Sequence, residues 1–470
     1  MTSIYPASGP SQTAELATLV LTPIKTAVSC LGATMEVLVR VQAPSEQPSQ
    51  STGDKTPQAT PKRLALVVDR SGSMHGEPLK EALACVQFIA ERLTKDDSLA
   101  LVVYDDAIET LVPLRAGISA SEIAQIIDGV ESGGSTNLFG GWQEGAEQLE
   151  GGNANAISRV ILLSDGQANH GLQNIEKIEG HCRKWLAKGV STTTVGLGRG
   201  FNENLMSAMA VAGGGQQYYG QTAADLFDSF DEEFSLLQAL TLRQLDVRFV
   251  PASGVIIEPV GLVQTNADSS VRLNDLAFGS EAWVLLRLHI SPGAVGTLRD
   301  CMAVTLNAKD MDGHAITPIM KILTLPVLDE ASYQALPKDD TVVRRTLELE
   351  FARDSQKLRQ IAKSGDAAEM KRFMDELQSR FGHHPWLADK LDRLRALAAV
   401  DLEMLSKEVM FSSAKMSRRL ESLHEVLYCM DQTEEAMPSF LRKKAEEGRG
   451  RPSDPDNILK NKNKTKKSTT

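Results

Sequence analysis

A chain of 470 residues is too long for a single ordinary hydrophobic core, so we expect two or three domains. Apolar residues make up 42% of the chain and charged residues 24%, as in an ordinary globular protein, and the net charge of −11 disfavours a general nucleic-acid binder. The five cysteines are far apart and contain no C-x-x-C pair, which indicates reduced thiols rather than disulfides or a zinc knuckle. Since neither a secretory leader nor a membrane-spanning stretch is recognisable, we expect a cytoplasmic protein.

The N-terminal part of the chain is expected to contain a short pair of strands. Residues 1–12 are interpreted as a loose terminus, and residues 13–43 contain the β-branched, alternating stretches LATLVLTPIKTAV and GATMEVLVRVQA, which predict a hairpin. Residues 44–61 are rich in Pro, Ser, Thr and Gln and have almost nothing to bury, so they predict a flexible linker.

Residues 62–240 are expected to form one α/β domain. Residues 64–68 are apolar without interruption, which fits a strand buried on both faces of a sheet, and SLALVVYD, RVILLSDG and VSTTTVGLG repeat this pattern. ETLVPL looks like a short edge strand, and amphipathic helical stretches separate the strands. The alternation predicts a doubly wound, mostly parallel sheet with ligand-binding loops at the carboxyl ends of its strands.

Polar residues follow three of these strands where ligands are expected. Asp69, Ser71 and Ser73 form an Asp-x-Ser-x-Ser loop after the first strand, Thr136 lies in the Gly-rich loop SGGSTN, and Asp165 ends a later strand. Carboxylate and hydroxyl oxygens suit Mg²⁺ or Mn²⁺ better than zinc. A plainer interpretation is that these are turn and cap residues, because Ser and Asp are common before helices.

This set of residues resembles the metal-ion-dependent adhesion site (MIDAS) of the von Willebrand factor A (VWA) domain, the fold shared with integrin inserted domains. The resemblance covers about residues 62–240 and matches the site residue by residue. It implies that Ser71, Ser73 and Thr136 touch the metal directly, that Asp69 and Asp165 act directly or through water, and that one coordination position is left for a partner's acidic residue. Neutral hydroxyl ligands would keep the ion electrophilic towards such a carboxylate.

Other polar residues are weaker candidates. Asp105 and Asp106 end the second predicted strand and either support the site or form a solvated turn. His75 lies just beyond the first loop and is either a rim residue or simply exposed. His383 and His384 are more typical of a helix end than of a metal site.

The chain changes character after residue 240. Residues 241–328 contain short strand-like segments separated by turn signals, which predicts a β-sandwich completed by the N-terminal strands, with the α/β domain inserted between its parts. This layout resembles bacterial and animal proteins with β-rich flanks, among them calcium-activated chloride channel-like proteins and inter-alpha-trypsin inhibitor heavy chains. Residues 329–430 predict a helical bundle or hairpin, and residues 431–470 predict a disordered tail.

The combined expectation is a non-enzymatic, cytoplasmic bacterial adaptor. Mg²⁺ (or Mn²⁺) at the five site residues would bind an Asp or Glu of a protein partner, with neither nucleic acid nor a membrane span involved. One alternative is a metal-dependent phosphohydrolase with Asp69 as nucleophile, although haloacid-dehalogenase-like phosphatases place an acid where this chain has Ser71. Another is a structural subunit whose metal only holds the loops together. The sequence leaves the partner's identity and the oligomeric state open.

Overall fold

The structure of this chain is a computed structural model. It describes residues 16–44, 60–151, 156–165, 168–197, 201–220, 239–261, 263–265, 270–418 and 421–422, together with positions 223, 226, 227, 230, 234 and 237. The expected loose terminus, most of the expected linker, most of the closing helix before residue 240 and the expected tail lie outside these residues.

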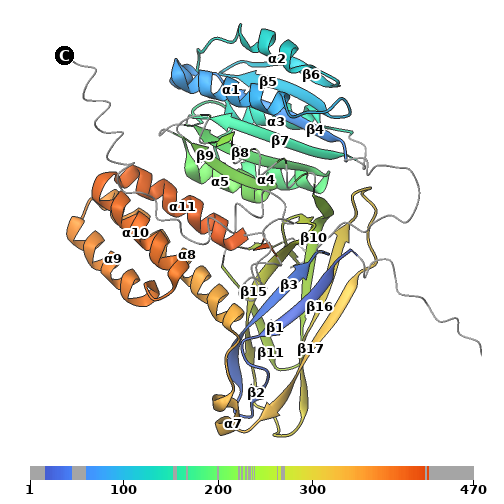
Figure 1. Cartoon of the computed structure of the whole chain (residues 1–470), viewed down its shortest axis with the longest axis vertical. Helices are drawn as coiled ribbons and strands as arrows, with labels where there is room; N and C mark the ends of the chain where they lie inside the picture. The colour runs from blue at the N-terminus through green and yellow to red at the C-terminus, as the bar shows by residue number, and fades with distance from the viewer. Residues whose placement is uncertain are drawn as a thin grey trace, which may run out of the picture.

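The described residues form three bodies. An α/β domain lies at one end of the molecule, a β-sandwich lies at the other, and a helical bundle lies beside both (Figure 1). Among the residues that the structure describes, no helix is both long and apolar enough to cross a membrane.

The α/β domain contains a mostly parallel sheet, as the sequence predicts. The strand order is β6-β5-β4-β7-β8-β9, and only the edge strand β6 runs antiparallel to its neighbour. The bounds are β4 (Lys62–Asp69), β5 (Ser98–Tyr104), β6 (Ile108–Ala116), β7 (Ile157–Ser164), β8 (Val190–Leu197) and β9 (Gly214–Gly220).

Helices cover both faces of this sheet because its central strands are apolar on both sides. In β4, Leu64 and Leu66 pack towards α1 and α2, whereas Ala65 and Val67 pack towards α3, α4 and α5. The bounds are η2 (Gly72–Met74), α1 (Glu77–Ala90), α2 (Ala120–Ile127), α3 (Leu138–Gln148), α4 (Ile175–Ala187) and α5 (Glu203–Ala212). The doubly wound fold class is therefore confirmed.

The β-sandwich is built from segments on both sides of the α/β domain. Its first sheet has the order β1-β3-β15-β11 with β18 added to β15, and its second has the order β12-β13-β10-β16-β17-β2 with β14 added to β10. The bounds are β1 (Thr18–Pro23), β2 (Val28–Ser29), β3 (Ala33–Gln42), β10 (Leu240–Pro251), β11 (Val255–Val260), β12 (Gln264–Thr265), β13 (Val271–Arg272), β14 (Leu276–Ala277), β15 (Ser280–Ile290), β16 (Leu298–Lys309), β17 (Ile319–Leu328) and β18 (Glu421–Ser422).

The N-terminal strands join this sandwich in a way that differs partly from expectation. β3 pairs antiparallel with β15 over its whole length, from Ala33 opposite Ile290 to Gln42 opposite Glu281. β1 and β3 are antiparallel partners, but they do not form a simple hairpin, because β2 lies between them in the chain and pairs with β17 of the other sheet. The α/β domain is thus inserted between β3 and β10.

The C-terminal region folds into helices whose ends are set by side-chain caps. Asp339 and Asp366 accept hydrogen bonds from the first turns of α8 and α9, and Gly365 ends α8 in the left-handed conformation (φ 71°). His384 precedes α10, so His383 and His384 lie in a helix–helix turn, as expected. The bounds are α7 (Glu330–Ala335), α8 (Asp340–Ser364), α9 (Ala367–Phe381), α10 (Pro385–Val400) and α11 (Leu402–Arg418).

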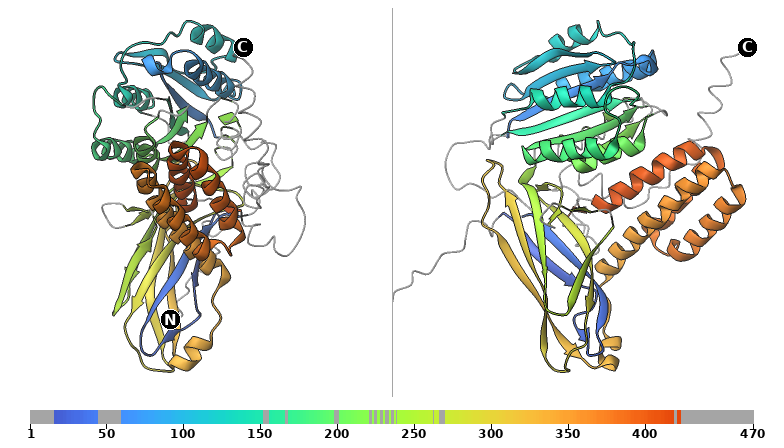
Figure 2. Two further views of the ribbon diagram at one scale, coloured as in Figure 1. Left: turned by 90° about the vertical axis from the view of Figure 1, so that its left-hand side faces the viewer. Right: turned by 180° about the vertical axis from the view of Figure 1, so that it is seen from behind.

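Polar contacts attach this bundle to the α/β domain. Arg359 of α8 donates from Nη2 to Glu203 Oε1 at 3.0 Å and to Asn204 Oδ1 at 2.8 Å. Tyr219 of β9 donates from its hydroxyl to Glu408 Oε2 of α11 at 2.5 Å. Because Glu203 begins α5, which follows β8, the bundle meets the side of the domain at which the parallel strands end (Figures 1 and 2).

Candidate metal-binding site

Two predicted site segments meet because the strands that precede them are neighbours. Asp69 is the last residue of β4, and Asp165 follows β7 directly. β4 and β7 are paired in parallel, with Val68 opposite Leu163, so both strands end at the same edge of the sheet. Ser71 and Ser73 lie in the turn that follows β4, which places them at this edge as well.

Hydrogen bonds connect four of the five predicted residues. The Ser73 hydroxyl donates to Asp165 Oδ1 at 3.0 Å, and the hydroxyl oxygens of Ser71 and Ser73 lie 3.2 Å apart. The backbone N–H of Ser71 donates to Asp69 Oδ1 at 2.9 Å. These contacts gather carboxylate and hydroxyl oxygens from two loops at one place.

Thr136 reaches the same edge through the backbone of its loop. The Gly72 N–H donates to the Gly134 carbonyl at 3.1 Å, and the Gly133 N–H donates to the Arg70 carbonyl at 2.8 Å, so the two loops lie against each other. Thr136 itself is buried, and its N–H donates to Asn169 Oδ1 at 2.7 Å. Its hydroxyl forms no hydrogen bond with the other predicted residues, so Thr136 is brought near them without being bonded to them.

The carboxylates of the site lack a cationic partner in the described part of the chain. Asp69 is fully buried, and burial raises its pKa; burial and the nearby charge of Asp69 also raise the pKa of Asp165. No described lysine or arginine forms an ion pair with either carboxylate. The Tyr104 hydroxyl is buried beside Asp69 and Ser164, and burial and the charge of Asp69 raise its pKa.

These features fit a bound divalent cation. Hard oxygen ligands are the type that Mg²⁺ and Mn²⁺ prefer, and a double positive charge would balance Asp69 and Asp165. Ser73 is exposed and Asp165 is partly exposed, so the site is open to solvent on that side. An approaching molecule could therefore reach an ion held there.

Some residues of the site were not found from the sequence. The Ser164 hydroxyl donates to Asp69 Oδ2 at 2.6 Å, and Tyr104 lies behind Asp69. Ser164 is the last residue of the buried strand β7. Only the expectation that β7 lies beside β4 could have indicated that Ser164 contacts Asp69. Asn169 lies beyond Asp165, in a segment for which the sequence offered no motif.

The weaker candidates lie around the site. Asp105 Oδ2 accepts from Arg70 Nε at 3.2 Å, and Asp106 Oδ1 accepts from the Ser135 N–H at 3.3 Å, so both carboxylates support the loops beside the site. His75 is exposed, with Nδ1 3.1 Å from the Ser132 hydroxyl oxygen, which places it on the rim.

A second group of potential ligands lies far from this edge. Asp310, Asp312 and His314 lie in the turn between β16 and β17, with their ligand atoms within 4.8 Å of one another. Asp310 Oδ1 accepts from the His314 N–H at 2.9 Å, so its carboxylate already stabilises the turn. The proximity of these three side chains is therefore explained by the conformation of the turn.

Comparisons with known proteins agree with this architecture. The family model for the von Willebrand factor type A domain matches residues 64–233. The Synechocystis protein sll0103 is 26% identical over 49% of this chain and 57% of its own length, and bovine inter-alpha-trypsin inhibitor heavy chain H3 is 24% identical over 47% of this chain and 28% of its own length. The chain thus spans little more than half of the length of the first relative and less than a third of the length of the second. A solved structure, a von Willebrand factor type A protein from Catenulispora acidiphila, is similar in fold with a TM-score of 0.65 at 14% identity, covering 86% of this chain and 97% of that one.

Proposed function

We propose, from the von Willebrand factor type A domain that this chain carries at residues 64–233, that the protein is an adaptor that uses a divalent metal ion to bind an acidic residue of another protein. Domains of this family are commonly metal-dependent protein-interaction modules. The observation that carries the proposal is the convergence of Asp69, Ser71, Ser73 and Asp165 at the carboxyl edge of the sheet.

Each proposed ligand has a role that follows from its contacts. The hydroxyls of Ser71, Ser73 and Thr136 would hold Mg²⁺ (or Mn²⁺), and the hydrogen bond from Ser73 to Asp165 would direct the lone pairs of Ser73 towards the ion. Asp69, with both carboxylate oxygens hydrogen-bonded, would orient the loop and complete the shell directly or through water. When bound, the ion would act as a Lewis acid that binds the carboxylate of the partner's Asp or Glu.

The contacts of Asp69 favour this proposal over a phosphohydrolase. A nucleophilic carboxylate needs an oxygen that can reach the substrate. Asp69 is fully buried, its Oδ1 accepts from the Ser71 N–H, and its Oδ2 accepts from the Ser164 hydroxyl. A buried carboxylate with both oxygens hydrogen-bonded is better placed to orient the other metal ligands than to attack a substrate.

We also propose a cytoplasmic location, as expected from the sequence. The four described cysteines are free, and Cys85 and Cys182 are buried. Burial raises the pKa of Cys85 to about 12, so this thiol stays protonated and unreactive. Free buried thiols are common in reducing compartments.

Metal binding is tested by titrating the full chain with Mn²⁺ and measuring the relaxation of water protons, which reports a bound ion and its exchangeable water. We expect the wild type to bind Mn²⁺, with Mg²⁺ as competitor, and Asp165→Ala to weaken binding by at least about tenfold. Ser132→Ala is the matched control, since Ser132 lies on the rim beside His75 and is no proposed ligand. Equal Mn²⁺ affinity in wild type and Asp165→Ala would overturn the site.

Partner binding is tested by affinity capture from native lysate, with Mg²⁺ or EDTA and with wild type or Asp165→Ala as bait. Proteins recovered only with Mg²⁺ and intact Asp165 would support the adaptor function. An unchanged set of proteins would mean that the metal only stabilises the loops. Turnover of an aryl phosphate that is lost in Asp69→Asn would favour the phosphohydrolase instead.

A further inference from the structure

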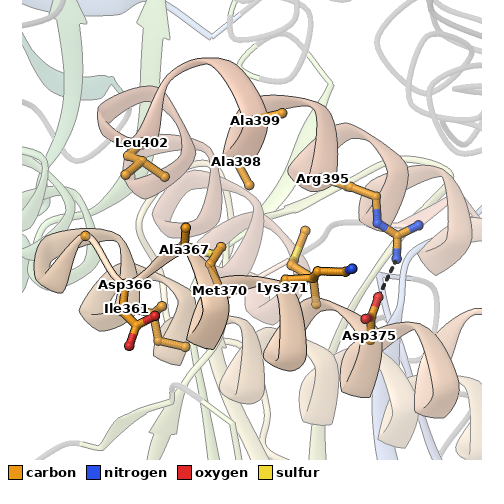
Figure 3. Close-up of a pocket in the computed structure, with 12 residues that line it drawn as sticks. Ile361, Asp366, Ala367, Met370, Lys371, Asp375, Arg395, Ala398, Ala399 and Leu402 are labelled. Atoms are coloured by element: carbon orange, nitrogen blue, oxygen red, sulfur yellow. Dashed lines mark ion pairs between the residues drawn. The ribbon is translucent and has the colours of Figure 1, made fainter.

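The outer end of the helical bundle carries an apolar pocket of about 340 Å³ that is open to solvent on one side. It lies where α8 ends, α9 begins, α10 ends and α11 begins (Figure 3). Ile361, Met370 and Met374 are buried beneath it, and Ala398 and Leu402 line its other side. Methionine side chains adapt to ligands of irregular shape, and pockets between the helices of bundles are common sites for small molecules.

Charged residues are distributed unevenly around this pocket. Lys371, Asp375 and Arg395 lie at one end, and Asp366 lies at the other (Figure 3). Arg395 Nη2 is 3.9 Å from Asp375 Oδ1, a long contact, and the exposed Lys371 forms no ion pair with any described residue. Two cations therefore face a single carboxylate at this end.

Asp366 does not cancel that positive charge. Its Oδ1 accepts from the N–H groups of Ala368 and Glu369, both at 2.9 Å, so the carboxylate caps the N-terminus of α9. The partial positive charge of a helix N-terminus compensates a carboxylate in this position. The end of the pocket at Lys371 and Arg395 thus keeps an excess of positive charge.

We propose that this pocket binds a small amphiphilic anion, with its apolar chain among the methionines and its carboxylate between Lys371 and Arg395. The volume lies near the lower end of the range for ligand pockets, roughly 300–1,000 Å³, so a short single chain fits better than a large ring system. A carboxylate beside a guanidinium and an ammonium gains charge-assisted hydrogen bonds. The inference is independent of the proposed metal site.

The proposal is tested with three probes that share one chain and differ in head group: octanoate, octanol and octylamine. Each is titrated into the full-length protein by calorimetry, and the site is located by NMR of methyl-labelled methionines. We expect octanoate to bind most tightly, with shifts at Met370 and Met374. Ala399→Trp, which fills the exposed mouth, is expected to abolish binding of all three probes.

A charge reversal separates the head-group contact from general apolar binding. Lys371→Glu is expected to weaken octanoate by about tenfold and to make octylamine the preferred probe. Arg372→Glu is the matched control, because Arg372 is the exposed neighbour of Lys371 on α9 and does not line the pocket, so the order of the probes should not change. Circular dichroism of each variant verifies the fold.

The opposite results would overturn the proposal. These are no binding of octanoate, octanoate binding that survives Ala399→Trp in a folded protein, or the same preference for octanoate in Lys371→Glu as in wild type.

Discussion

Gly134 determines how closely the Thr136 loop approaches the first loop. Its φ of 66° lies in the left-handed region, and a Cβ added there would lie 1.9 Å from Asp106 Oδ1. We expect Gly134→Ala to cost about 1–2 kcal/mol of folding free energy, as measured by chemical denaturation, and to weaken metal binding because the loop shifts.

Gly133→Ala is the control for this substitution. Gly133 has no positive φ, and a Cβ there would meet nothing within 4 Å. Equal stability losses in Gly133→Ala and Gly134→Ala would show that the conformation of Gly134 is not what holds the loop.

The hydroxyl of Thr136 can be tested without disturbing the loop. Thr136→Val keeps the shape and the backbone contacts to Asn169 but removes the hydroxyl. We expect Mn²⁺ affinity to fall by roughly 10–100-fold in Thr136→Val and to be largely retained in Thr136→Ser. Undiminished affinity in the valine variant would remove Thr136 from the ligand set.

The sequence located the site residues better than their surroundings. Asp69 ends β4 and the other four proposed ligands lie in the loops where the sequence placed them, because a motif such as Asp-x-Ser-x-Ser is local and strands of a parallel sheet end at a common edge. Their role as ligands stays a prediction. Ser164 and Tyr104 could not be identified, since their proximity to Asp69 depends on the pairing of separate strands.

At the scale of single elements, β4 is fixed at its amino end by a buried ion pair. Lys62 Nζ lies 3.1 Å from Asp97 Oδ1, and both side chains are almost fully buried. Burial raises the pKa of Asp97, but hydrogen bonds from the Thr94 and Lys62 N–H groups and the charge of Lys62 lower it further than burial raises it, so it lies below the ordinary value.

Because of this ion pair, we expect the folding stability of the protein to decrease in acid. Because the folded-state pKa of Asp97 is below the unfolded value of about 4, its stabilisation is present above that pH and is lost as the pH falls through the folded-state pKa. Asp97→Asn should cost about 3 kcal/mol at neutral pH and less in acid, as measured by urea unfolding.

Asp96→Asn is the control for Asp97→Asn, because Asp96 is the exposed neighbour of Asp97 and has no contact with Lys62. A difference between wild type and Asp97→Asn that is the same at pH 7 and in acid would contradict the assigned cause.

Strands and helices long enough to carry a repeating apolar pattern were predicted more reliably than short elements. The apolar strands of the central sheet and the capped helices follow the sequence closely, whereas the two residues of β2 carry no pattern. The break between α10 and α11 was also not predicted. Asp401 is extended there (φ −155°), and its Oδ1 accepts from the Met404 N–H at 3.0 Å, so a single capping residue interrupts a helical spacing that continues on both sides.

At the scale of the whole molecule, Arg359 connects two of the bodies. It is the α8 residue that donates to Glu203 and Asn204 at the start of α5. We expect Arg359→Ala to increase hydrogen exchange at the beginning of α5 and in α11 by about tenfold or more, since each lost charged hydrogen bond is worth about 1.5–3 kcal/mol.

The control for Arg359→Ala lies on the same helix. Arg353 has a side chain that is 65% exposed and pairs with the adjacent Asp354, so Arg353→Ala should leave exchange in α5 unchanged. Faster exchange in α5 with both variants would indicate a general loosening of α8. The sequence predicted a separate helical region but not this contact, because nothing local in α8 or α5 marks the other helix as its neighbour.

The pairing of β3 with β15 has a consequence for the order in which the protein folds on the ribosome. Gln42 leaves the exit tunnel long before Glu281, its neighbour in the sandwich, has been made. The whole α/β domain emerges in between, and domains generally fold as units during synthesis. Until β15 is synthesised, β1 and β3 have no completed sheet to join, and their apolar residues, such as Val37 and Val39, remain available to chaperones or to aggregation. The inserted domain thus delays closure of the β-sandwich until β15, β16 and β17 have been made, and the helical bundle is synthesised after them.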